Sequence, residues 1–164
     1  MLSGADYHHT ETLVDKTYRQ YSENYWSKKT FAPSSLLFYV GFDKKLINVN
    51  HHTLFFDVDF DVHAEAIYDD PKWPENPLFY ASFPSKTDVN SAPEGQEAGI
   101  FLIPLAPGLE DTPELRESYF EKIITRFETL TSQKIKNHII FKESFCINAF
   151  LQAYNSYTGN AYGM

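Results

Sequence analysis

The chain has 164 residues and a formal net charge of −8, so a nucleic-acid partner is disfavoured, because a phosphate backbone requires a basic face. Its single cysteine excludes an internal disulfide, and no apolar run is long enough to span a bilayer, so a cytoplasmic location is expected. Aromatic residues make up 16% of the chain, and these large rings must pack in a core or line a cavity.

The first quarter of the chain predicts helices followed by a strand. A helix is expected to begin at Asp6 or Thr10, because both residue types cap helix N-termini. An aromatic stripe at helical spacing between Tyr18 and Trp26 predicts a second helix, whose rings we interpret as core rather than as a ligand wall. Residues 36–42 form a continuous apolar run, which is typical of a strand.

Two further strands are expected in the middle of the chain, at residues 54–56 and 78–83, with a helix at 61–68 between them. Three prolines between residues 71 and 77 leave no room for another element. The polar stretch 84–96 has no periodicity, and it predicts an exposed hairpin loop.

The stretch 99–130 has the clearest boundaries. Residues 100–103 predict a core strand, which the segment 104–108 ends because its two prolines lack ladder donors. Thr112 supplies an N-cap hydroxyl, and Pro113 suits the first helical position. The helix then carries one apolar stripe that must cover a sheet. Its members are Leu115, Tyr119, Phe120, Ile123, Ile124, Phe127 and Leu130.

The last part of the chain predicts a strand at 138–141, a short helix capped by Ser144 and a loop over 154–164. Strands with inserted helices indicate an α+β fold, with a mixed, mostly antiparallel sheet covered by one long helix. Residues 1–164 are expected to form a single domain.

No pattern identifies a catalytic centre or a metal site. The acids at 57–61 lack the glycine and glutamate that a calcium loop requires at its sixth and twelfth positions. The adjacent pairs His8-His9 and His51-His52 are expected to point apart, so neither pair chelates one metal alone. Cys146 lies between apolar neighbours and is expected to be buried and inert. No glycine-rich phosphate loop or nucleophile elbow occurs.

Several short motifs follow one another along the chain. They are SGADYHHTE at 3–11, PSS at 33–35 with YVG at 39–41, HHTLFF at 51–56, PSKTD at 84–88, APEG at 92–95 and APGLE at 106–110. In this order they resemble successive motifs of bacterial-type phytoene desaturases. The ending YNSYTGNAYG at 154–163 resembles that family's approach to its C-terminal flavin segment.

The resemblance implies that the chain is the substrate-binding domain of an FAD-dependent carotenoid desaturase about three times as long. Such an enzyme removes a hydride and a proton from adjacent carbons, with the flavin as acceptor. The chain would then be a fragment without the glycine-rich loop that seats FAD, inactive on its own, within a phytoene-type desaturase of carotenoid biosynthesis.

The implied substrate is a hydrophobic polyene in an apolar tunnel. Tyr39, His52, Phe55 and Phe79 lie along the expected strands and are our candidates to line it. The resemblance also makes the tail residues Gly159, Tyr162 and Gly163 candidates for cofactor binding.

Because carotenoids reside in bilayers, the full-length enzyme is expected to be peripherally membrane-associated. The aromatic segment 18–26, with Arg19, Lys28 and Lys29 beside it, is the expected contact. Two alternatives remain open: a non-enzymatic binding module for a polyene or lipid, and an amine-oxidase-like flavoenzyme acting on another apolar substrate.

Overall fold

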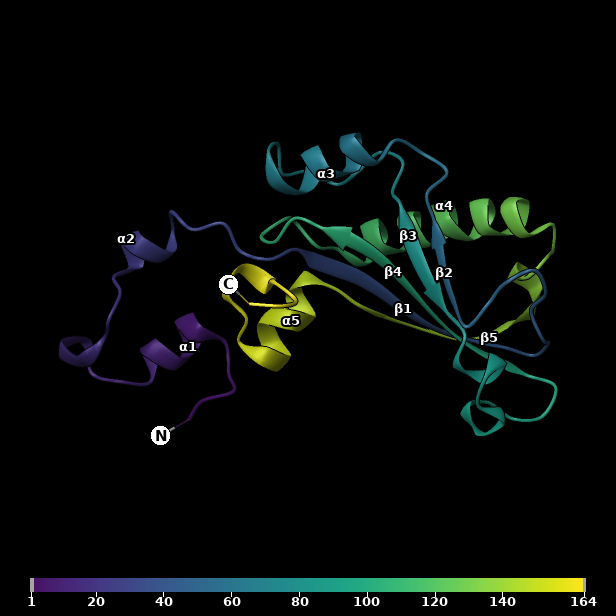
Figure 1. Ribbon diagram of the computed structural model, residues 1–164, viewed down its shortest axis with the longest axis horizontal. Helices are drawn as coiled ribbons and strands as arrows, with labels where there is room; N and C mark the ends of the chain where they lie inside the picture. Colours follow the sequence, from purple (N-terminus) through teal and green to yellow (C-terminus); the bar gives the residue numbers. More distant parts are fainter. Residues whose placement is uncertain (1, 164) are drawn as a thin grey trace.

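A five-stranded sheet organises the computed structural model, which describes residues 2–163 (Figure 1). All of its strand pairs are antiparallel, in the order β2-β3-β4-β1-β5, and one long helix covers it. The expected α+β class is therefore confirmed. The strands are β1 Ser34–Phe42, β2 His52–Phe55, β3 Phe79–Ser82, β4 Glu97–Leu105 and β5 Ile139–Phe145.

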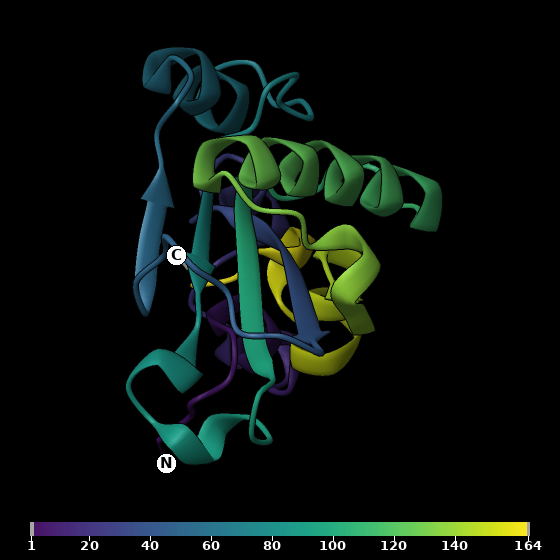
Figure 2. The same cartoon turned by 90° about the vertical axis from the view of Figure 1, so that its right-hand side faces the viewer.

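The long helix is α4, Pro113–Thr131, and it crosses one face of the sheet (Figure 2). As predicted, the Thr112 side chain caps it by accepting from the N–H of Leu115 at 3.2 Å. Ring contacts join helix and sheet, including Phe38 with Phe120 at 4.9 Å between centroids and Phe101 with Phe127 at 5.4 Å. The predicted stripe is buried from Tyr119 to Phe127 but not at Leu130, which is 46% exposed.

Four shorter helices complete the fold in the part of the chain that the structure describes: α1 Tyr7–Thr12, α2 Glu23–Trp26, α3 Phe60–Tyr68 and α5 Ile147–Tyr154. α1 begins after Asp6, as expected, because the Asp6 carboxylate accepts from the N–H of His9. α3 covers the helix predicted at 61–68, and the Asp59 side chain caps it. The predicted loop at 84–96 joins the antiparallel strands β3 and β4, as a hairpin loop should, and it contains two short 3-10 turns.

The aromatic helix expected at 18–26 is wrong. Tyr18 is 83% exposed at the end of a short 3-10 helix, and only the four residues of α2 are α-helical. Trp26 is 1% exposed, because the rings of Tyr7 and Tyr21 pack on it edge-on at 5.2 and 5.5 Å. A side chain buried in this way cannot enter a bilayer, so the expected membrane contact at Trp26 is also wrong.

Two predicted boundaries need correction. β4 continues through Pro104 to Leu105, although proline was expected to end it. Pro104 lies beyond the last residue of β4 that pairs with β3, and its carbonyl points to that side, toward α3. In an antiparallel strand, the nitrogen and the carbonyl of one residue point to the same side. The nitrogen of Pro104 therefore faces no strand, and the missing N–H removes no hydrogen bond from the sheet. Similarly, β5 continues through Ser144 to Phe145, so Ser144 does not cap α5, which begins at Ile147.

Candidate functional site

The face of the sheet opposite α4 carries a continuous row of apolar side chains. Residues that pair directly across the strands form the row, one from each strand. We call them the apolar row: Leu54, Tyr80, Leu102, Leu37 and Phe145. Their exposure distinguishes this open face from the α4 face, because alternate residues of β4 are fully buried toward α4 and only half-buried here. The row therefore offers a hydrocarbon surface about 19 Å long, from four strand spacings of about 4.8 Å.

A second cross-strand row on the same face is more polar. It consists of His52, Ser82, Ile100, Tyr39 and Glu143. The imidazole Nδ1 of His52 lies 2.5 Å from the hydroxyl oxygen of Tyr80, which joins the two rows at the β2 edge. The open face is thus an apolar strip with polar groups along one side.

α5 limits the apolar row at the β5 edge. Phe145, the last member of the row, packs edge-on against Phe150 at 4.8 Å and also contacts Tyr154 at 6.0 Å. Both partners belong to α5, which lies on the opposite side of the sheet from α4 (Figure 1).

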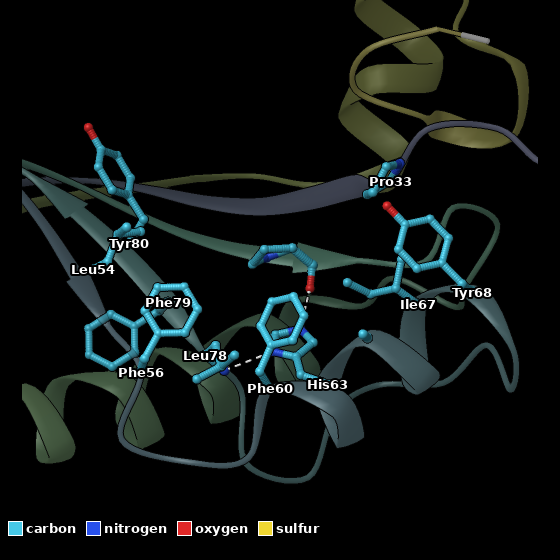
Figure 3. Close-up of a pocket in the computed structure, with 12 residues that line it drawn as sticks. Pro33, Leu54, Phe56, Phe60, His63, Ile67, Tyr68, Leu78, Phe79 and Tyr80 are labelled. Atoms are coloured by element: carbon cyan, nitrogen blue, oxygen red, sulfur yellow. Dashed lines mark hydrogen bonds between the residues drawn. The ribbon is translucent and has the colours of Figure 1, made fainter.

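An apolar cavity of about 230 Å³ lies at the other end of the row. The cavity lies between α3 and β4, just before the first residue of β3. Leu54 and Tyr80 lie at one end of it and Pro33 and Tyr68 at the other (Figure 3). The remaining lining residues are Phe56, Phe60, His63, Ala64, Ile67, Leu78, Phe79 and Pro104. We call this space the α3 cavity.

His63 holds α3 against the sheet through both ring nitrogens. Its Nδ1 accepts from the backbone N–H of Leu78 at 2.9 Å, so the proton must sit on Nε2, which donates to the Pro104 carbonyl at 2.9 Å (Figure 3). Burial lowers the pKa of His63 below its ordinary value, and the nearby positive charge of Arg126 adds to this effect. The imidazole is therefore a neutral structural link with no free polar atom.

The four predicted substrate-binding residues divide between the two faces of the sheet. Tyr39 and His52 lie on the open face, in the polar row. Phe55 and Phe79 point the other way, where their rings stack at 4.4 Å and Phe55 packs on Phe127 of α4. Phe79 also reaches the wall of the α3 cavity.

Sequence reasoning did not select the members of the apolar row. Alternation along a strand would have separated the faces, but residues 36–40 are apolar at every position. Only the register of strand pairing shows which alternate residues of the strand face α4. For Leu54 and Leu102, no signal in the isolated sequence was available.

The tail residues with an expected role in cofactor binding have different surroundings. Gly159 is buried, with φ +73°, and an added Cβ would lie 2.6 Å from Cγ2 of Ile147, so this glycine is required by packing. Gly163 has φ +87° with open space around it, and Tyr162 is 73% exposed. Tyr162 and Gly163 line one pocket together with Asp6, but Gly159 does not reach it, so the three residues do not share one site.

The helix N-termini do not fit FAD either. A pyrophosphate binds best at a helix start with free N–H groups and a glycine-rich turn. At the start of α5, the Asp111 carboxylate already accepts from the N–H of Asn148 at 2.8 Å. At the start of α4, Pro113 has no N–H and Glu114 is negatively charged. These two helix starts therefore do not offer an FAD phosphate site.

The other candidate groups are structural. His51 and His52 do not point apart as expected, because their rings stack at 4.1 Å. Within residues 2–163, no group of three or more His, Cys, Asp or Glu side chains is placed to hold a metal ion. Cys146 is fully buried, and this burial raises the pKa of its thiol to about 12, so it is unreactive as predicted.

Comparison with known proteins gives the family. Over 165 residues the chain is 38% identical to a carotenoid 3,4-desaturase from Haloarcula japonica, a match that covers 100% of this chain and 33% of the relative. This match supports a place for the chain in the carotenoid desaturase family. The resemblance inferred from the motifs is therefore confirmed, and this chain spans about one third of the length of that desaturase relative.

Two further relatives are named as oxygenases. The 4,4'-diaponeurosporene oxygenases of Staphylococcus haemolyticus and Staphylococcus aureus are each 26% identical over 136 residues, covering 81% of this chain and 27% of the relative. No family model matches the sequence. Among residues 2–163, no helix is both long enough and apolar enough to cross a bilayer.

Proposed function

We propose that the protein is an oxidoreductase that desaturates a phytoene-type carotenoid, and that the open face of the sheet forms one wall of its polyene site. The observation that carries this proposal is the apolar row, which crosses all five strands without interruption. The names of the relatives, a carotenoid desaturase and two carotenoid-type oxygenases, support a polyene as the substrate class.

The physical match between this face and a polyene is direct. A carotenoid hydrocarbon has no hydrogen-bonding groups along its length, so its binding depends on apolar area removed from water, at about 25 cal/mol per Å². The apolar row presents side chains that are accessible but only partly exposed at Leu102, Leu37 and Phe145. A rigid sheet also holds them in place, so a ligand does not have to order them on binding.

We infer that the full-length protein depends on FAD, as the family resemblance implies. The starts of α4 and α5 do not fit its phosphates, so we assign the described residues the wall of the substrate site and place the FAD site on other parts of the protein. It follows that these 164 residues alone are expected to bind polyene and to show no turnover.

A substitution on the open face tests the proposal. Leu102→Glu in the full-length protein should weaken binding of an acyclic C40 polyene at least tenfold, because a carboxylate would be desolvated against hydrocarbon. Ile140→Glu is the matched control, because Ile140 is 56% exposed on β5 outside the apolar row. Equal affinity of the two variants would contradict the proposed site.

Product analysis separates the remaining alternatives. A desaturase yields a polyene with one more double bond for each turnover. Binding without any turnover of the full-length protein would favour the binding module, and oxidation of a different apolar substrate would favour the amine-oxidase-like enzyme.

We also propose that the full-length protein contacts a membrane surface near the α3 cavity. Phe56 and Phe60 are 57% and 58% exposed, and both line the cavity. Exposed rings beside an apolar cavity suit a protein that draws an insoluble substrate from a bilayer. In liposome flotation, the double variant Phe56→Ser, Phe60→Ser should lower the fraction of protein bound to liposomes. The control Tyr18→Ser should leave that fraction unchanged. An unchanged bound fraction for the double variant would contradict this placement of the membrane contact.

A further inference from the structure

We propose that the α3 cavity is a blind subsite for one end of the polyene, and that it accepts an acyclic, methyl-branched hydrocarbon terminus. The inference rests on the proposed function, because it assigns a defined part of the substrate to a space at the end of the apolar row. It adds a selection at the end of the chain, which neither the apolar row nor the names of the relatives specify.

The first argument is continuity. Leu54 and Tyr80 belong both to the apolar row and to the lining of the α3 cavity. A hydrocarbon that follows the row from Phe145 toward the β2 edge therefore reaches the cavity without crossing a polar group. α5 limits the row at its opposite end, so the cavity is the place where an extended chain can end.

The second argument is chemistry. The only imidazole nitrogens in the lining are those of His63, and both are already engaged by Leu78 and Pro104. The carbonyl of Pro104 accepts one of these bonds, and the Tyr80 hydroxyl is bonded to His52 and points away from the cavity (Figure 3). A hydroxyl or carbonyl on the polyene terminus would therefore lose its water without gaining a partner, apart from the Tyr68 hydroxyl at the edge.

The third argument is size. A cavity of about 150 Å³ with an apolar lining holds a benzene molecule, so 230 Å³ corresponds to roughly nine carbon atoms. This is close to two isoprene units of an acyclic terminus. A cyclised end group is wider in cross-section, and the space between Phe60 and Pro104 is limited by α3, which His63 fixes to the sheet.

Filling the cavity tests the proposal. Ala64 lies in the lining, and Val62 is 62% exposed on the same helix outside it. In the full-length protein, Ala64→Trp should weaken binding of lycopene, an acyclic C40 polyene, at least tenfold, while Val62→Trp should stay within twofold of wild type. Ala64→Leu, a smaller change, should give an intermediate loss if the tryptophan variant fails to fold.

Photocrosslinking of the wild type provides a readout without any substitution. An acyclic polyene with a diazirine at its terminus should label peptides covering residues 54–68, and one with the diazirine at mid-chain should label β4 and β1. Terminal labels confined to β1, β4 or β5, or unchanged lycopene affinity in both Ala64 variants, would overturn the subsite. If Leu102→Glu still abolishes binding in that case, the proposed function stands; if wild type binds no lycopene, both proposals fail.

Discussion

The imidazole of His63 donates from Nε2 to the carbonyl oxygen of Pro104 at 2.9 Å, and this bond attaches α3 to β4. It occurs at the one point where a proline lies inside a long strand of the sheet. Since β3 does not extend to this residue, and the Pro104 carbonyl points away from β1, the carbonyl is free to accept from a helix. The result is the α3 cavity, which exists because the sheet is incomplete at this edge.

Acid should weaken this link. Burial lowers the pKa of His63, so the folded state favours the neutral ring, whereas the unfolded ring titrates near its ordinary pKa of about 6.5. The stability contribution is therefore complete above about pH 6.5 and declines as the pH falls below it, because only the unfolded state then takes up the proton. Urea unfolding at pH 7.5 and 5.5 should show a larger loss for wild type than for His63→Gln. Equal losses of unfolding free energy in the two proteins would show that His63 does not contribute to the acid sensitivity.

The buried side of α4 should tolerate no charge. Ile123 is completely buried between helix and sheet, so Ile123→Asp should cost on the order of 3 kcal/mol or more in unfolding free energy. Thr125→Asp, at an exposed position of the same helix, serves as the control and should change stability by about 0.5 kcal/mol or less. Chemical denaturation followed by circular dichroism measures both, and similar costs would contradict the assigned face.

The sequence was sufficient for α4 and insufficient for the candidate site, and the reason is physical. In α4, the cap at Thr112, the proline at 113 and the period of the stripe all depend on neighbours along the chain. The apolar row depends on the pairing of residues such as Leu54 and Phe145, which lie far apart in the sequence. For the same reason, we could not predict that Phe55 and Phe79 face α4 while Tyr39 faces away from it.

The aromatic segment before β1 shows a second limit. Helical spacing between Tyr18 and Trp26 predicted one helix, but the rings instead form a cluster around Trp26 that includes Tyr7 and Tyr21. Contacts between rings favour compact packing without requiring a regular backbone. Periodicity in a segment rich in aromatic residues is therefore weak evidence for a helix.

The starts of α4 and α5 should depend on one buried ion pair. Burial opposes ionisation of Asp111, but the Arg116 guanidinium and the N–H of Asn148 outweigh it and hold the pKa of Asp111 below its ordinary value. Asp111→Ala leaves Arg116 without its partner and should cost about 3 kcal/mol. Ser118→Ala, at an exposed position on α4, is a neutral control. Thermal unfolding compares them, and a loss below about 1 kcal/mol for Asp111→Ala would contradict the role of the pair.

Two glycines of the tail should respond differently to the same substitution. Gly159→Ala places a Cβ 2.6 Å from Cγ2 and 2.7 Å from the carbonyl oxygen of Ile147, so it should cost about 3 kcal/mol or prevent folding of the tail. Gly163→Ala also has a positive φ but meets no atom within 4 Å, so only the backbone cost of about 1 kcal/mol remains. Equal effects in thermal unfolding would show that Gly159 is not packed as described.

The 164-residue chain on its own should not bind FAD. A pyrophosphate needs free N–H donors at a helix start. The start of α4 at Thr112 has a proline and an acid, and at the start of α5 after Cys146 the N–H of Asn148 already binds the Asp111 carboxylate. The net charge of −8 also repels the phosphates. Titration with FAD, followed by flavin fluorescence, should show no saturable binding up to tens of micromolar, on the order of ordinary cofactor affinities. The full-length protein is the positive control and should bind FAD, because the family resemblance places the phosphate site outside these residues. Saturable micromolar binding to the 164 residues, abolished by Gly163→Val, would instead assign the cofactor to the tail.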